Sequence, residues 1–179
     1  MSDAFIRHPH ERALYEPLVG KTMLELGNKR QPEGTYKDYF TALGYAHTSV
    51  DWNGQDGALK VDLRRPLELG TFDMVSNIGT TEHVDKQEPV WRNICEAMAV
   101  GSVLVSTTPK PGHWPRHGFW YPTEEFYPAL ADLNGMEIER FFETPEEYNN
   151  LADNMFFCRM RKVELVPFSM PVGMMFDNR

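Results

Sequence analysis

The chain has little cysteine: only two of its 179 residues, with no CxxC pair and no cluster of cysteine with histidine. The sequence therefore lacks zinc-site spacing, and no metal is expected. No apolar run approaches the roughly 18 residues that a membrane-spanning helix requires. The first 17 residues lack the apolar segment of a signal peptide. Because Cys95 and Cys158 both lie in apolar segments, as buried thiols do in a reducing compartment, we expect a cytoplasmic protein with no membrane partner.

Positive charge is scarce as well, since 18 Lys and Arg against 26 Asp and Glu give a net charge of −8. An acidic surface repels phosphate backbones, which disfavours sequence-independent binding of nucleic acid and favours a small-molecule partner. Internal repeats and low-complexity tracts are absent, and a hydrophobic content of 41% excludes global disorder. The length predicts a single domain over residues 1–179 and leaves the oligomeric state open.

Short apolar runs alternate with segments of helical period, which indicates a doubly wound α/β fold with a mostly parallel sheet. We expect strands at residues 22–26, 46–51, 58–62, 71–77 and 101–109, and two final strands at 136–143 and 154–165 joined by residues 144–153. We expect helices at residues 33–44, 86–99 and 123–135. Pro128 lies in the second turn of the last helix, so this helix begins later than Thr123 or is kinked. The Met- and Phe-rich tail has no clear period, and it either binds a partner or packs on its own domain.

The end of the first strand is the first candidate binding element. Glu25 and Gly27 end this strand, but the further glycines of a typical nucleotide-binding loop are replaced by Asn28 and two basic residues. A glycine here lets the backbone approach a ligand, and the next helix is expected to present free N–H groups. Asn28 tolerates left-handed backbone conformations better than most residues, so the loop can keep its shape.

Two aspartates follow the next strands. Asp51 ends the second strand, 24 residues after Gly27, where a carboxylate can accept hydrogen bonds from both ribose hydroxyls. Asp62 comes directly after the third strand, where it can accept from an adenine amino group. The structural alternatives are a strand-end glycine, a solvated aspartate and the N-cap of a short turn.

The segment "FDMVSNIGTTEHV", residues 72–84, ends a fourth strand near Asn77 and Gly79 and leads through a polar turn to His83. A histidine at this edge of a parallel sheet faces the ligand crevice, and its ordinary pKa near 6.5 suits proton transfer. The alternative is a structural histidine.

A loop rich in Pro, Gly, His and aromatic residues follows the fifth strand. Its side chains either contact an acceptor, through stacking or proton transfer, or simply cover the open end of the sheet. The candidate substrate contacts are His113, His117, Trp120 and Tyr121.

Together these segments resemble the class I S-adenosylmethionine-dependent methyltransferases. "LELG" at 24–27 is similar to their first motif, "VDWNG" at 50–54 to the end of their second strand, and "VDLRRPL" at 61–67 to their adenine-side motif. "FDMVSNIGTTEHV" and "GSVLVSTTPKPG" resemble their fourth-strand and fifth-strand motifs. The resemblance covers about residues 20–163 and leaves a tail at 164–179.

The resemblance implies a seven-stranded, Rossmann-like sheet with an antiparallel C-terminal strand and helices on both faces. It implies an enzyme that uses S-adenosyl-L-methionine and releases S-adenosyl-L-homocysteine. Carried over by position, the cofactor-binding residues are Glu25, Gly27, Asn28, Asp51, Asp62, Asn77 and Gly79, and His83 is the first candidate for a catalytic base. The basic residues after Asn28 come close to the cofactor's carboxylate end. Few residues precede the first strand, so a large lid over the substrate is not expected.

Two other functions compete with this interpretation. An NAD-binding module also uses a strand, a glycine turn and an acidic residue, but the G-x-G-x-x-G fingerprint is absent. A catalytically silent binding or interaction module on the same fold is the more serious alternative, because the glycine-poor loop is also what lost cofactor affinity predicts. The sequence does not name the methyl acceptor.

Overall fold

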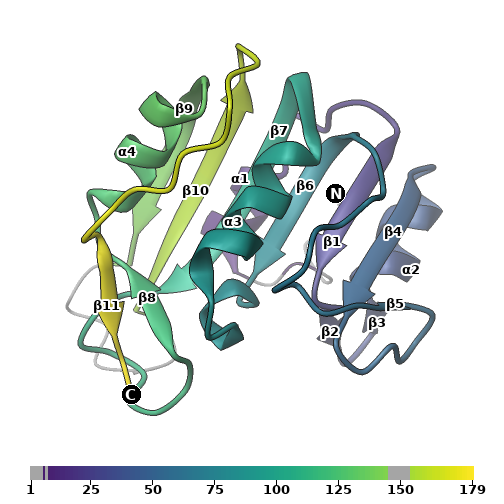
Figure 1. Cartoon of the computed structure of the whole chain (residues 1–179). Coiled ribbons are helices and arrows are strands. Elements are labelled where there is room, and N and C mark those ends of the chain that lie inside the picture. The colour runs from purple at the N-terminus through teal and green to yellow at the C-terminus, as the bar shows by residue number, and fades with distance from the viewer. Residues whose placement is uncertain (1–5, 7, 145–153) are drawn as a thin grey trace.

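The computed structural model describes residue 6, residues 8–144 and residues 154–179. Its main element is a seven-stranded sheet in the order β5-β4-β1-β6-β7-β10-β9 (Figure 1). The strands are β1 (Thr22–Leu26), β4 (Ala46–Asp51), β5 (Leu59–Lys60), β6 (Phe72–Ile78), β7 (Met98–Pro109), β9 (Met136–Glu143) and β10 (Met155–Lys162). Strands β5, β4, β1, β6 and β7 pair in parallel, whereas β10 is antiparallel to both β7 and β9. The predicted mostly parallel sheet with one antiparallel C-terminal strand is therefore confirmed.

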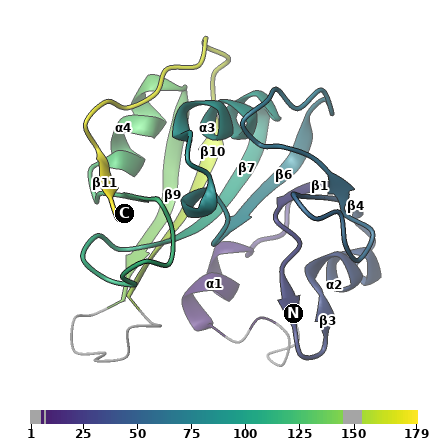
Figure 2. The ribbon, with the colours of Figure 1, turned by 60° about the horizontal axis from the view of Figure 1, so that its bottom comes forward.

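Helices cover both faces of this sheet (Figure 2). Helices α3 (Gln87–Glu96) and α4 (Phe126–Leu133) lie on one face, and α1 (Pro9–Leu14) and α2 (Tyr36–Ala42) lie on the other. The alternation of side chains along β1 supplies both layers, because Leu24 packs in the core under α3 and Met23 in the core under α2. Burial on both faces explains why the strands read as continuous apolar runs.

Helix α4 begins at Phe126, three residues after the earliest predicted start. Pro128 is thus its third residue, where the backbone N–H of any residue lacks a partner within the helix. The ring is tolerated because no hydrogen bond is lost. Helix α3 ends at Glu96, earlier than expected, because β7 already begins at Met98.

A short hairpin that the sequence did not predict separates Gly27 from α2. It consists of β2 (Arg30–Gln31) and β3 (Gly34–Thr35). Helix α2 therefore starts nine positions after Gly27, and its first N–H groups are not free: Thr35 Oγ1 accepts from Asp38 N, and Asp38 Oδ2 accepts from Thr35 N. The expectation that this helix offers free N–H groups beside the glycine is wrong, because a capping box already uses them.

The tail packs on the domain to which it belongs. Strand β11 (Met175–Asp177) pairs with β8 (Trp120–Pro122), and Phe168, Met170 and Met174 pack against the core on the α3 side. Of the connection expected at 144–153, residues 145–153 lie outside the described residues. No helix in the described part of the chain is long and apolar enough to cross a membrane.

Candidate functional site

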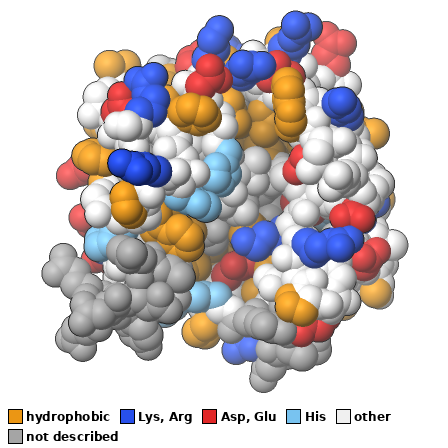
Figure 3. Space-filling model, turned by 90° about the horizontal axis from the view of Figure 1, so that it is seen from below, with side chains coloured by type: hydrophobic (Ala, Val, Ile, Leu, Met, Phe, Trp, Pro, Cys, Tyr) orange, Lys and Arg blue, Asp and Glu red, His pale blue; other side chains and the backbone are white. Residues whose placement is uncertain are grey.

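The carboxyl ends of β1, β4 and β6 meet where the strand order reverses, and a cavity of about 720 Å³ opens there. In doubly wound sheets this switch point is where ligands bind. Figure 3 shows this end of the molecule: the face is hollowed near its middle, with histidine, basic and acidic side chains around the hollow. The lining residues are Gly27, Asn28, Lys29, Arg30, Asp51, Trp52, Val61, Asp62, Leu63, Arg64, Ile78, Gly79, Thr80, His83, Val84, Asp85 and Phe119.

The turn after β1 holds its shape with a single glycine. Gly27 has φ +77°, donates its N–H to Val50 O at 2.8 Å, and lies so close to Thr80 that an added Cβ would be 2.4 Å from Thr80 Oγ1. Asn28 is not among the residues with positive φ, so it does not take the left-handed role proposed from its side chain. Its amide instead donates to Gln55 O at 3.1 Å and ties the turn to the segment after β4.

Glu25 lies beneath this turn and does not line the cavity. Its Oε1 accepts from Lys29 N at 2.8 Å, and its Oε2 is 3.4 Å from His47 Nε2, with both side chains buried. Burial raises the pKa of Glu25 to about 8 and lowers the pKa of His47 to about 4. Burial thus disfavours the charged form of both side chains. Glu25 therefore supports the turn through its hydrogen bond with Lys29 N.

The two aspartates both line the cavity. Asp51 Oδ1 accepts from Asn53 N at 2.8 Å, in a turn that fixes the carboxylate at the end of β4. Asp62 accepts two side-chain hydrogen bonds of 2.9 Å from Arg64, which lower the pKa of its carboxyl to about 2. Trp52 stands beside them with 67% of its surface exposed, and the Arg64 guanidinium is 5.8 Å from its ring centroid.

Asn77 and Gly79 have different positions after β6. Asn77 is fully buried and does not line the cavity. Its amide accepts from Thr81 N and donates to Thr81 Oγ1 and Ser106 Oγ, which anchors the 3-10 helix η1 (Thr81–His83) to β7. Gly79 does line the cavity and has φ +67°. Asn77 thus supports the turn that leads to His83 and is not itself part of the cavity wall.

None of the four predicted acceptor contacts lines the cavity, but His117 lies close to His83, which does. Tyr121 is fully buried and donates to Trp114 O at 2.6 Å, and the Trp120 indole donates to Asp85 O at 2.9 Å. Neither residue lines the cavity, and neither does His113. Phe119 is the aromatic residue of this loop that does.

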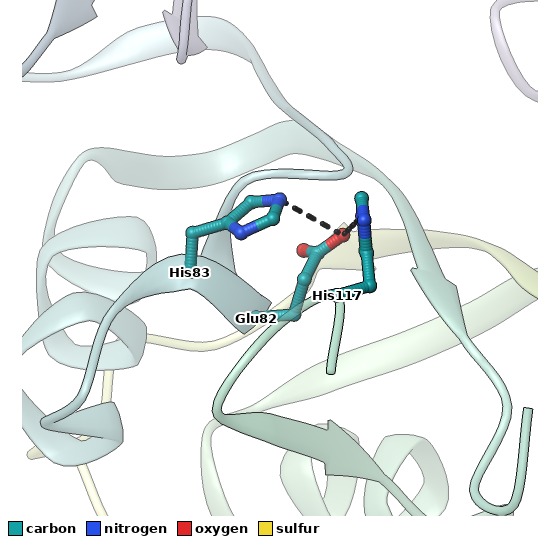
Figure 4. Close-up of side chains that lie close together, drawn as sticks. All are labelled: Glu82, His83 and His117. Atoms are coloured by element: carbon teal, nitrogen blue, oxygen red, sulfur yellow. Dashed lines mark ion pairs between the residues drawn. The ribbon is translucent and has the colours of Figure 1, made fainter. Parts of the chain in front are cut away.

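Glu82, His83 and His117 form a cluster beside the cavity (Figure 4). Glu82 Oε1 is 4.0 Å from Nε2 of each histidine, and the two imidazole centroids are 4.7 Å apart. Glu82 is 1% exposed, and burial raises its pKa to about 7. Burial likewise lowers the pKa of both histidines.

Sequence reasoning missed Glu82, Trp52 and Arg64. Glu82 precedes His83 directly, but nothing in the local pattern shows that its side chain turns inward toward a histidine 35 positions away. For Trp52 and Arg64 a signal existed, because each lies within two residues of an aspartate that was selected.

No protein-family model and no curated protein sequence matches this chain. Solved structures, in contrast, match this chain. The N-methyltransferase NodS from Bradyrhizobium japonicum WM9 has a TM-score of 0.64 and 14% identity, covering 88% of this chain and 95% of that one. The 1,6-didemethyltoxoflavin-N1-methyltransferase of Burkholderia thailandensis, solved with 1,6-didemethyltoxoflavin and S-adenosylhomocysteine, has a TM-score of 0.63 and 15% identity, with 88% and 78% covered. An S-adenosylmethionine-dependent methyltransferase from Mesorhizobium loti has a TM-score of 0.63 and 16% identity, with 86% and 96% covered. The chain is similar to these proteins in fold.

Proposed function

We propose that this chain, which has the fold of class I S-adenosylmethionine-dependent methyltransferases, is an enzyme that transfers a methyl group to a small molecule. The observation that carries the proposal is the cavity at the switch point. It brings together Gly27, Asp51, Asp62 and Gly79, four residues that come from different strand ends. Its volume of about 720 Å³ lies within the usual range for small-molecule and cofactor sites.

The proposed cofactor is S-adenosyl-L-methionine, with Asp51 at the ribose and Asp62 at the adenine amino group. Arg64 already binds both oxygens of Asp62, but an ionised carboxylate has about four acceptor positions, so one more donor can be accepted. The exposed ring of Trp52 offers a flat apolar surface for the base. Gly27, Asn28 and Gly79 form the cavity wall beside the methionine part, where Lys29 supplies a positive charge for its carboxylate.

The chemistry required of the chain is orientation and exclusion of water. Bound S-adenosyl-L-methionine supplies an electrophilic methyl group on a good leaving group, and S-adenosyl-L-homocysteine is the product. The protein holds the acceptor's lone pair in line with that methyl group, and proximity of this kind can supply much of the acceleration. His83 lines the cavity and is the proposed proton acceptor for a protonated acceptor group. The proposed acceptor contacts on the facing loop are Phe119, which lines the cavity, and His117, which does not line it but lies 4.7 Å from His83 between ring centroids.

A small-molecule acceptor is proposed over nucleic acid because of the net charge of −8. The similar structure from Burkholderia thailandensis was solved with 1,6-didemethyltoxoflavin bound, which supports the same choice. We further propose one domain over residues 1–179 and a cytoplasmic setting, supported by the buried free thiols of Cys95 and Cys158.

The competing candidate is a catalytically silent binding module on this fold. The specific observation in its favour is the ion pair between Arg64 and Asp62. In a site that no longer binds cofactor, an internal contact of this kind would occupy the carboxylate.

Calorimetry with S-adenosylmethionine and S-adenosylhomocysteine separates the two. We expect saturable binding of one cofactor per chain, and no binding at millimolar cofactor would remove the enzyme. Asp51→Ala should weaken binding at least tenfold, whereas Asp132→Ala, on the exposed side of α4, should leave it unchanged. Equal affinities for the two variants would mean that Asp51 does not contact the ribose.

A further inference from the structure

The cluster of Glu82, His83 and His117 offers one carboxylate oxygen and two imidazole nitrogens, all within 4.8 Å of one another. Two ligands on one ion at bond lengths of about 2.1 Å can be at most about 4.2 Å apart, and about 3.4 Å in a tetrahedral site. The 4.0 Å from Glu82 Oε1 to each imidazole nitrogen is already near this reach. The side chains of His83 and His117 are 46% and 38% exposed, so both have room to rotate inward.

Glu82 needs a partner that the surrounding protein does not supply. Its side chain is 1% exposed, and among the residues that the structure describes no hydrogen-bond donor reaches Oε2. A buried carboxylate is costly unless it is paired, coordinated to a metal or protonated. Nε2 of His83 and Nε2 of His117 are each 4.0 Å from Oε1, which is beyond hydrogen-bond distance. The gap between the three side chains is of the size that one coordinated cation bridges.

The loop that carries His117 is fixed against Glu82. Phe119 N donates to Glu82 O at 2.7 Å, and Gly118 packs so closely that an added Cβ would be 2.7 Å from the same carbonyl oxygen. Trp114 and Arg116 hold φ values of +53° and +63°, a strained conformation for residues with side chains. Strain of this kind persists where the surrounding contacts impose it, so the backbone on either side of His117 is held in place.

We propose that Glu82, His83 and His117 bind one divalent transition-metal ion, of the class that includes Zn²⁺, Co²⁺ and Fe²⁺. Two imidazoles and one carboxylate form a borderline donor set, whereas Mg²⁺ and Ca²⁺ prefer oxygen ligands alone. Three protein ligands leave at least one coordination position open, as in catalytic sites. Because His83 lines the cavity, an ion bound to it would lie next to the place where the acceptor is proposed to bind.

Charges around the cluster act in both directions. Lys29 lines the same cavity and opposes a cation, while Asp85, also in the lining, favours one. The proposed use of the metal rests on the proposed methyl transfer: an acceptor hydroxyl or amine binds the ion, loses its proton to solvent more easily, and presents a free lone pair. In that case His83 is a ligand and not the base. The binding site itself does not depend on methyl transfer.

Titration of the full chain with Zn²⁺ or Co²⁺, without cofactor, tests the site. We expect one ion per chain by calorimetry and a visible Co²⁺ absorption that reports nitrogen and oxygen ligands. His83→Gln, His117→Gln and Glu82→Gln should each weaken binding at least tenfold. His113→Gln is the matched control, because it removes an imidazole from the same loop outside the cluster, and it should bind as the wild type does.

Wild-type protein that takes up neither ion would overturn the proposal. So would His117→Gln with unchanged affinity, which would indicate an adventitious ion only, or an equal loss in His113→Gln. Glu82 is buried and its variant can fail to fold, but the partly exposed His83 and His117 still decide the result. Since S-adenosylmethionine is absent, failure here leaves the separate cofactor titration intact, and the two proposals can fail independently.

Discussion

Replacing Gly27 with alanine tests whether one glycine is enough for the turn at the end of β1. The residue has φ +77°, and a Cβ added to it would be 2.4 Å from Thr80 Oγ1. Alanine in the left-handed region costs about 1–2 kcal/mol. The overlap adds about 1–3 kcal/mol as the side chain of Thr80 is displaced. Displacement also breaks the 2.7 Å hydrogen bond from Thr80 Oγ1 to Leu26 O, which contributes about 1 kcal/mol.

Gly44→Ala supplies a matched control for this variant. Gly44 has φ +87°, and no atom of the described residues lies within 4 Å of its added Cβ, so only the backbone cost applies. Urea unfolding should therefore show Gly27→Ala less stable than Gly44→Ala by about 2–4 kcal/mol. Because Gly27 and Thr80 both line the cavity, S-adenosylmethionine affinity should fall at least tenfold in the first variant and stay unchanged in the second.

A double variant tests whether the overlap with Thr80 causes the loss of stability in Gly27→Ala. Thr80→Ala removes the atom that the new methyl group meets. The double variant therefore has no overlap and loses the Thr80 hydrogen bond only once, so it should be more stable than the sum of the single losses by about 2–4 kcal/mol. Additive losses, within about 0.5 kcal/mol, would refute the steric argument. Equal stabilities of Gly27→Ala and Gly44→Ala would refute it independently.

Two further predictions concern buried charge. The raised pKa of Glu25, about 8 when folded, means that the folded state binds this proton more tightly; its contribution is full below pH 4.5 and is lost as pH rises to about 8. Glutamine cannot ionise, so Glu25→Gln should remove this pH-dependent loss of stability, which is at most about 5 kcal/mol. In urea unfolding, the stability of the variant relative to the wild type should therefore rise between pH 5 and pH 9. Parallel pH profiles of the two proteins would contradict the assignment. Arg159 is 1% exposed and donates to Glu139, Leu14 O and Pro17 O. Arg159→Met should destabilise the fold by about 3–5 kcal/mol, whereas the more exposed Arg161→Met, which removes another partner of Glu139, should cost about 1 kcal/mol or less; similar melting temperatures for the two would contradict this.

The order and type of the main-sheet elements could be predicted because their signals are local. An apolar run such as residues 101–109 reads as a covered strand whatever lies around it, and Gly27, Asp51 and Asp62 mark strand ends within a few residues. Once the sheet is parallel, its topology brings those ends to one edge. That these residues lie at one cavity could thus be predicted without knowledge of any side-chain contact.

Glu25, Asn77 and Tyr121 were predicted to contact a ligand but do not line the cavity, because the side chain at each position has two possible directions. Glu25 and Asn77 lie on strands that are buried on both faces, and the sequence does not tell whether a polar side chain there meets a ligand or a hydrogen-bonding partner inside the protein. Tyr121 was selected for its aromatic ring, yet its hydroxyl finds Trp114 O within the same loop. The hairpin after Gly27 was missed because strands of two residues have no detectable period.

The scarcity of glycine in the first turn has a physical explanation in these contacts. Further glycines are needed where a helix N-terminus must follow the turn at once and bring its backbone against a ligand. Here the chain first forms the hairpin β2–β3, and the turn is held by Val50 O above and by the carboxyl of Glu25 below. Within the turn itself, residues 27–29, only Gly27 has a left-handed conformation and a close neighbour, so only Gly27 must lack a side chain there. The residues that follow are therefore free to carry the amide and the positive charges that line the cavity.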